Sequence, residues 1–226
     1  MIRRPPRSTL SSSSAASDVY KRQLVDSEAI GNRFISEALT LAGIPISAEG
    51  ALSKFLGGKL TQIKEDAEKQ LGFSLPANWV DEIYKKQFSE FRKNLKSISG
   101  IEDVLDVLER INIPVCVGSN GPLNKMEVSL GVTKLKDRFL GRIFSADQVE
   151  RPKPAPDLYL YCAEQMGVLP QDCLVIEDSP KGASAGVAAG MSVFGYTGGE
   201  DDSALKRVGC TKVFDNMREI AAFLDN

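Results

Sequence analysis

The chain has 226 residues, of which 42% are hydrophobic, enough for one core domain and a small accessory domain. Its 28 Lys and Arg residues nearly balance its 30 Asp and Glu residues, so no whole-molecule attraction to nucleic acid or to an anionic membrane is expected. Histidine is absent, which removes the usual general base of Ser-His-Asp and Cys-His hydrolases and most zinc chemistry. Acid–base chemistry must therefore come from carboxylates or lysine.

The four cysteines are far apart and form no Cys-x-x-Cys pair, which argues against a zinc site and against a redox motif. Reduced thiols in a cytosol-like compartment are the simplest interpretation. No apolar run approaches the roughly 20 residues that a membrane-spanning helix needs. We therefore expect a cytoplasmic protein with neither a membrane nor a nucleic acid as partner. The sequence does not indicate an oligomeric state.

Residues 1–23 differ in character from the rest of the chain. They are rich in Ser, Arg and Pro, contain a single acidic residue, Asp18, and show no helical or strand period. Such a composition suits an organelle transit peptide, and it is also typical of a disordered tail. We favour a third interpretation, in which adapter- or vector-derived sequence is joined to a genuine coding frame, because an amphipathic pattern begins abruptly at Leu24.

Residues 26–96 show a helical pattern that is interrupted at 42–45, 57–58 and 75–76. Within it, apolar residues recur at intervals of three and four, namely Val80, Ile83, Tyr84, Phe88 and Phe91. Such a stripe can be the inner face of a small helical bundle or a partner-binding surface. We favour the inner face, with Trp79 packed beside it.

After Gly100, short apolar runs alternate with helical segments, which predicts βα units and a parallel sheet in an α/β fold. The predicted strands are 114–117, 142–145, 174–177, 192–196 and 212–214, and the predicted helices are 101–110, 123–130, 156–166, 181–189 and 217–224. Ligands of such sheets bind outside the carboxyl ends of the strands. The residues that follow each strand are therefore the candidates for a site.

Two candidate groups follow the first two of these strands. Ser119, Asn120 and Gly121 offer a hydroxyl and consecutive backbone N–H groups that can cradle an anion, although the same residues are common in ordinary turns. Lys153 lies between two prolines, which restrict the backbone and would present the ammonium in a defined direction at a helix start. The alternative is a solvated lysine in a loop. The rigid backbone between the two prolines favours a functional lysine.

A third group, Glu177 and Asp178, ends the next strand immediately before a helix N-terminus. Paired carboxylates suit a hard divalent cation such as Mg²⁺, which takes few carboxylates and completes its shell with water and phosphate oxygens. Asp178 or Ser179 could instead cap the following helix. Capping does not require Glu177, so the pair favours a metal site.

Together, Ser119-Asn120-Gly121, the Arg-Pro-Lys-Pro sequence around Lys153 and the Glu177-Asp178 pair resemble, in order and spacing, three of the four motifs of the haloacid dehalogenase superfamily. The resemblance runs from Leu24 to near the end of the chain. It implies a Rossmann-like parallel sheet core made of residues 24–30 and 97–226. Residues 31–96 would then form a small helical cap.

The resemblance also implies a role for each candidate. Ser119, with the backbone of Asn120 and Gly121, would bind the transferred phosphoryl group. Lys153 would neutralise phosphate charge and orient the nucleophile, while Asp178, helped by Glu177, would hold Mg²⁺. The family's first motif, Asp-x-Asp-Gly-Thr at the end of the first strand, supplies one Asp that forms an aspartyl-phosphate and a second that acts as acid and base.

The first motif is where the chain departs from the family. The five positions before Leu24 hold Val19, Tyr20, Lys21, Arg22 and Gln23, so neither aspartate is present, and Asp18 stands one place too early. We therefore expect the first central strand, which carries this motif, to be missing or degraded.

The implied function is that of a Mg²⁺-dependent phosphatase-type hydrolase acting on a small phosphorylated metabolite, such as a sugar phosphate, phosphogluconate or phosphoglycolate. The chain as written would be inactive, because it lacks the attacking carboxylate. The alternatives are a pseudoenzyme that binds a phosphometabolite without turning it over, a β-phosphoglucomutase-like mutase, and a haloacid dehalogenase proper. The Glu177-Asp178 pair favours the metal-dependent phosphatase over the dehalogenase.

Overall fold

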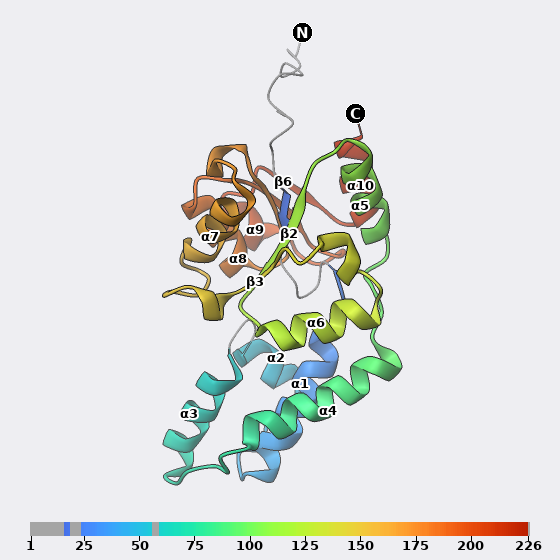
Figure 1. Cartoon of the computed structure of the whole chain (residues 1–226). Coiled ribbons are helices and arrows are strands. Elements are labelled where there is room, and N and C mark those ends of the chain that lie inside the picture. Colours follow the sequence, from blue (N-terminus) through green and yellow to red (C-terminus); the bar gives the residue numbers. More distant parts are fainter. Residues whose placement is uncertain (1–15, 19–23, 56–58, 226) are drawn as a thin grey trace.

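A computed structural model of the chain describes residues 16–18, 24–55 and 59–225 (Figure 1). The centre of the fold is a six-stranded, entirely parallel sheet with the order β3-β2-β1-β4-β5-β6. Its strands are β1 (Ala16–Asp18), β2 (Val115–Ser119), β3 (Ile143–Ser145), β4 (Leu174–Glu177), β5 (Ser192–Tyr196) and β6 (Lys212–Phe214). The strand order reverses direction on either side of β1, which places the switch point of the sheet at its centre.

Helices cover both faces of the sheet (Figure 1). They are α5 (Ile101–Arg110), α6 (Leu123–Val132), α7 (Asp157–Met166), α8 (Pro180–Ala188), α9 (Ser203–Arg207) and α10 (Met217–Leu224), with 3-10 turns η2 (Lys136–Phe139), η3 (Ala146–Gln148) and η4 (Pro170–Asp172). After residue 100, each predicted helix and strand agrees with the structure to within two residues at either end.

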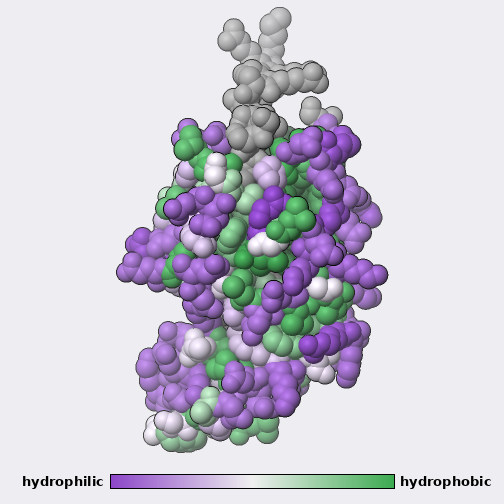
Figure 2. Space-filling model, viewed as in Figure 1, coloured by the Kyte–Doolittle hydropathy of each residue, from purple (hydrophilic) through white to green (hydrophobic). Residues whose placement is uncertain are grey.

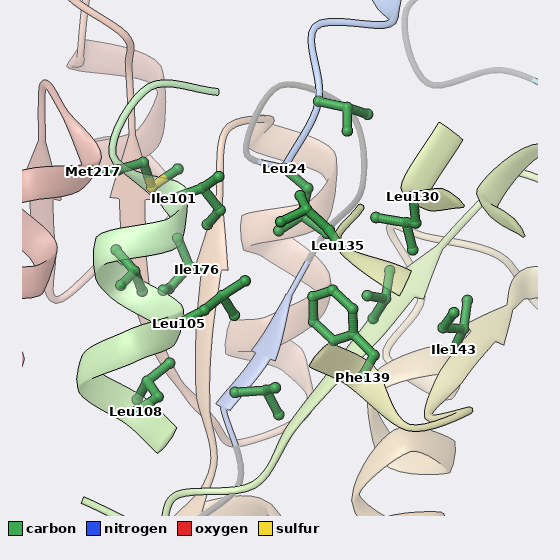
Figure 3. Packing of buried hydrophobic residues seen from close by; sticks show 14 of the residues in the cluster. Leu24, Ile101, Leu105, Leu108, Leu130, Leu135, Phe139, Ile143, Ile176 and Met217 are labelled. Carbon is green, nitrogen blue, oxygen red and sulfur yellow. The ribbon is translucent and has the colours of Figure 1, made fainter. Parts of the chain in front are cut away.

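Successive side chains along each strand point to opposite faces of the sheet, so the core has two layers. On β2, Val115 and Val117 join a cluster under α5, α6 and α10, whereas Cys116 between them packs against α7. Figure 3 shows the first layer, in which Ile101 and Leu105 of α5 face the sheet. Buried on both faces, the strands read as nearly continuous apolar runs, which is why the sequence pattern located them.

The first central strand, predicted to be missing or degraded, is not missing, because β1 stands between β2 and β4 as a strand of three residues. Asp18 is its last residue and is in register with Val117 of β2 and Ile176 of β4. Ala, Ser and Asp have low strand propensity, so the sequence pattern does not indicate this strand. Strands β2 and β4 each have backbone groups that need a partner, and that tertiary requirement overrides propensity here.

Four further helices lie beyond the end of the sheet (Figure 1). They are α1 (Glu28–Leu41), α2 (Ala48–Phe55), α3 (Leu60–Leu71) and α4 (Trp79–Asn94), and they share a hydrophobic cluster of their own. The predicted apolar stripe of α4 packs inward, with Ile83 buried among these helices and Phe91 buried in the sheet layer. Trp79 is packed beside it, as expected.

Two chain segments connect α1–α4 to the sheet, and they run side by side. Val25 and Ser97 form an antiparallel bridge. The Ile98 N–H donates to the Leu24 carbonyl at 2.9 Å. The division into a core of residues 24–30 and 97–226 and a cap of residues 31–96 remains a prediction.

The face shown in Figure 2 is mostly hydrophilic, with apolar residues gathered near its middle. Leu41, Phe73, Leu140 and Leu169 are the most exposed large hydrophobic side chains of the described residues. Among residues 16–18, 24–55 and 59–225, no helix combines the length and the apolar character that crossing a membrane requires.

Candidate active site

The carboxyl ends of β2 and β4 flank the switch point, and Lys153 joins them. Its ammonium Nζ lies 2.8 Å from the carbonyl oxygen of Gly118 on β2 and 3.1 Å from Oε1 of Glu177 on β4. The Lys153 side chain is 4% exposed and that of Glu177 is 0% exposed, so the ion pair is buried. The structure thus brings together residues from motifs that lie far apart in the sequence.

Glu177 is held from two sides. Its Oε1 accepts hydrogen bonds from Lys153 and from the hydroxyl of Tyr159. Its Oε2 accepts from the N–H of Asp178 and from both the N–H and the hydroxyl of Ser179, each at 3.1 Å. A buried carboxylate needs such partners, since an unpaired buried charge is costly.

Helix α8 approaches Glu177 so closely that a side chain is excluded at Gly182. A Cβ built on Gly182 would lie 1.4 Å from Glu177 Oε1. The helix begins with an N-cap bond in which the Gly182 N–H donates to Ser179 Oγ at 3.1 Å. Ser179 therefore serves as the cap that sequence reasoning offered as an alternative role, and it also contacts the acid pair.

The Asn120 side chain makes two hydrogen bonds with the backbone of Lys153. Its Oδ1 accepts from the Lys153 N–H at 3.0 Å, and its Nδ2 donates to the Lys153 carbonyl at 3.1 Å. The sequence assigned Asn120 to phosphate through its backbone and missed this side-chain contact. A contact across 33 residues of chain leaves no trace in local spacing.

The turn after β2 is fixed by hydroxyl groups. Ser119 is 1% exposed, and its Oγ accepts from the Gly121 N–H at 3.0 Å. The Gly121 carbonyl in turn accepts from Ser145 Oγ on the adjacent strand β3 at 2.9 Å. The predicted anion cradle therefore lies at the sheet edge that also carries Lys153.

The predicted metal ligands lie at the same edge. Asp178 is half-buried directly after β4, beside the fully buried Glu177. In the described part of the chain, no group of three or more His, Cys, Asp or Glu side chains could hold a metal ion. Mg²⁺ is commonly held by one or two carboxylates, with water and phosphate completing its shell. Both oxygens of Glu177 already accept hydrogen bonds, so Asp178 is the carboxylate of the pair that fits direct contact with the ion.

The predicted nucleophile positions, residues 19–23, lie outside the described residues. The backbone of Asp18 ends β1 between the other two strands of the site.

Sequence reasoning missed a contact between the helical segment and the sheet edge. Lys59, at the start of α3, pairs with Asp147 of η3 at 2.6 Å. Burial, with the Asp147 charge as a second cause, raises the pKa of Tyr84 on α4 to about 12. The ion pair therefore joins the start of α3 to η3 near the end of β3, and a partly exposed lysine in a glycine-rich stretch gave no sign of it.

The fold and site define a doubly wound α/β protein with a lysine–carboxylate site at its switch point. The profile of the family described as haloacid dehalogenase-like hydrolase matches residues 22–196. The chain is 34% identical over 172 residues to 6-phosphogluconate phosphatase of Escherichia coli K12, which covers 76% of each protein. The chain belongs to the haloacid dehalogenase-like hydrolase family.

Solved structures show the same fold. A conserved haloacid dehalogenase-like protein of unknown function from Agrobacterium tumefaciens is 31% identical, with a TM-score of 0.74 over 93% of this chain and 96% of that one. A putative β-phosphoglucomutase from Thermotoga maritima has a TM-score of 0.75 over 93% and 98% of the two chains. At 22% identity, the latter likeness concerns the fold alone.

Proposed function

We propose that the native gene product is a Mg²⁺-dependent phosphatase of a small phosphorylated metabolite, and that this chain lacks the nucleophile. The observation that carries the proposal is the buried Lys153–Glu177 pair, which stands beside the Ser119 turn at the switch point. The relative that is 34% identical is a 6-phosphogluconate phosphatase, which supports a phosphorylated sugar or sugar acid as substrate. A cytoplasmic location belongs to the same proposal.

The chain's own residues supply binding and charge neutralisation. Ser119 and the backbone that follows it would bind the phosphoryl oxygens, and the buried Lys153 would offset their charge. Asp178, helped by Glu177 beside it, would hold Mg²⁺, which when bound supplies further charge neutralisation. Residues 31–96 would act as a cap that closes over this edge.

The nucleophile is the missing part. In the family the attacking group is the first Asp of the motif, and here that position holds Val19, with Lys21 in place of the second Asp. Charge neutralisation cannot replace an attacking carboxylate. We therefore expect phosphate binding without turnover.

Two measurements on the purified chain test this proposal. Calorimetric titration with inorganic phosphate in the presence of Mg²⁺ should detect binding that is lost with a chelator. Release of phosphate from 6-phosphogluconate and from p-nitrophenyl phosphate should stay at the background rate. Turnover at an ordinary enzymatic rate would overturn the claim of inactivity, and absence of phosphate binding would overturn the proposed site.

Restoring the motif gives the converse test. The substitutions Val19→Asp, Lys21→Asp, Arg22→Gly and Gln23→Thr, made together, rebuild the family's first motif in register with Leu24. The restored chain should release phosphate in a Mg²⁺-dependent manner, whereas the same chain with Val19→Asn in place of Val19→Asp should not. Equal inactivity of both chains would count against the assignment of the nucleophile.

A pseudoenzyme is the competing explanation, in which residues 19–23 are a genuine replacement. The genomic reading frame upstream of Leu24 distinguishes the two. An apolar strand ending in Asp-x-Asp-Gly-Thr at that position excludes the pseudoenzyme. Interconversion of hexose phosphates by the restored chain would instead identify a mutase.

A further inference from the structure

Tyr159 on α7 lies within the buried charge pair, although no sequence motif gave it a role. Its side chain is fully buried. The hydroxyl oxygen is 2.8 Å from Lys153 Nζ and 2.9 Å from Glu177 Oε1, and these two atoms are themselves 3.1 Å apart. The three polar groups therefore form a closed triangle.

The chemistry of the groups fixes the direction of each hydrogen bond. An ammonium group only donates, a carboxylate only accepts, and a phenol can do one of each. Lys153 therefore donates to Tyr159, and Tyr159 donates to Glu177. With the Gly118 carbonyl as the third acceptor, the three ammonium hydrogens are matched by three acceptors.

Lys153 is thus held at both ends. Asn120 binds its backbone N–H and carbonyl, as described above. At the other end, the phenol limits rotation of the ammonium, and the Tyr159 ring lies against it with its centroid 4.3 Å from Nζ. A charge that is oriented before the ligand arrives needs no reorganisation when the ligand binds.

We propose that Tyr159 is a positioning residue for Lys153: the Tyr159 hydroxyl holds the ammonium in the position from which its charge offsets that of a bound phosphoryl group. This inference rests on the proposed function, since it assigns Lys153 to that group. The competing explanation is a structural one, in which the hydroxyl satisfies buried charges and contributes to stability alone. That role would lower the melting temperature without changing the affinity of the folded protein for an anion.

The variant Tyr159→Phe separates the two roles, because it removes the hydroxyl and keeps the ring. Tyr161→Phe is the matched control, since Tyr161 lies on the same helix and its hydroxyl accepts from Gln148 Nε2 at 3.3 Å. Both variants are titrated with inorganic phosphate in the presence of Mg²⁺, well below their melting temperatures. We expect about three- to tenfold weaker binding for Tyr159→Phe, as loss of one hydrogen bond implies, and no change for Tyr161→Phe.

Nuclear magnetic resonance of the ¹⁵N-labelled lysine side chains gives an independent measurement. A buried ammonium with three acceptors exchanges its hydrogens slowly, so Lys153 should give a protected signal. That signal should be lost in Tyr159→Phe and kept in Tyr161→Phe. Absence of a protected Lys153 signal in the unsubstituted chain would overturn the proposal, whether or not Tyr159→Phe folds.

The measurements distinguish failure of the positioning role from failure of the proposed function. If the unsubstituted chain binds phosphate and Tyr159→Phe binds it equally well, the positioning role is overturned and the proposed function stands. If the unsubstituted chain binds no phosphate, the proposed function is overturned. The ammonium signal then decides the contact between Tyr159 and Lys153 by itself.

Discussion

Gly182 is a single residue on which the geometry of the buried pair depends. A methyl group at this position would overlap Glu177 Oε1 and drive the carboxylate away from Lys153. Separating a buried ion pair costs about 3–5 kcal/mol. We expect Gly182→Ala to lower the free energy of unfolding by about that amount, measured by urea denaturation.

Gly131→Ala controls for the general effect of replacing a helical glycine. Gly131 lies on α6, and a Cβ added there has no atom within 4 Å. Alanine is the better helix former, so this variant should be as stable as the unsubstituted chain or more stable, by up to about 1 kcal/mol. If both variants lose the same stability, the contact between Gly182 and Glu177 is not the cause.

At the residue scale, the sequence predicted that Lys153 and Glu177 lie at one edge of the sheet, but not the contacts that join them. Lys153 and Glu177 stood out because strand ends in a parallel sheet share one edge. Tyr159 did not, because an aromatic residue on the inner face of a helix is typical of an ordinary core. Its role depends on an atom contributed by β4, and spacing along α7 carries no information about that strand.

At the scale of elements, the ion pair between Lys59 at the start of α3 and Asp147 of η3 connects the helical segment to the sheet edge. Lys59 and Asp147 are both partly exposed, so their ion pair contributes about 0–1 kcal/mol. The electrostatic effect on Tyr84 gives a more sensitive measure of this contact. Burial is the main cause of its raised pKa, and the Asp147 charge adds to it.

Asp147→Asn removes that charge at nearly constant size. We expect the pKa of Tyr84 to fall from about 12 part of the way toward 10.0, because burial still opposes ionisation. The pKa is measured from the tyrosinate absorbance, with Tyr84→Phe used to identify the signal. Asp137→Asn, on η2, should leave the pKa of Tyr84 unchanged. An equal value in Asp147→Asn and the unsubstituted chain would show that α4 does not face Asp147 in solution.

Element boundaries were predictable where helices and strands alternate with clear stops. Gly167 and Gly190 follow α7 and α8 in left-handed conformations, which only glycine adopts readily. Helix α9 was missed, because five residues are too few to show a period. The long-range pairing of Lys59 with Asp147 has no local signal of any kind.

At the scale of the whole molecule, the central strand shows the limit of sequence reasoning. β1 contributes three residues of weak strand propensity, and its place is decided by the two strands on either side. The α/β class was predictable because it follows from the repeated βα pattern after residue 100. The identity of the segment at the centre was not, since that depends on which backbone groups remain to be paired.

The free energy of unfolding should fall in alkaline solution, because the pKa values of Cys210 and Tyr84 are raised in the folded chain. Burial, with the charge of Glu177 as a second cause, raises the pKa of the Cys210 thiol from 9.0 to about 11. The pKa of Tyr84 rises from 10.0 to about 12. Between about pH 9 and 12 the unfolded chain therefore releases protons that the folded chain retains.

The free energy of unfolding therefore decreases as the pH rises. Both contributions are fully present below about pH 9, and they are lost as the pH rises through the two folded-state pKa values. Urea denaturation at about pH 8, 9, 10 and 11 should show a declining free energy of unfolding. The decline should be shallower in the double variant Cys210→Ala, Tyr84→Phe, because neither group can then ionise. An identical decline in both proteins would mean that other groups govern alkaline unfolding.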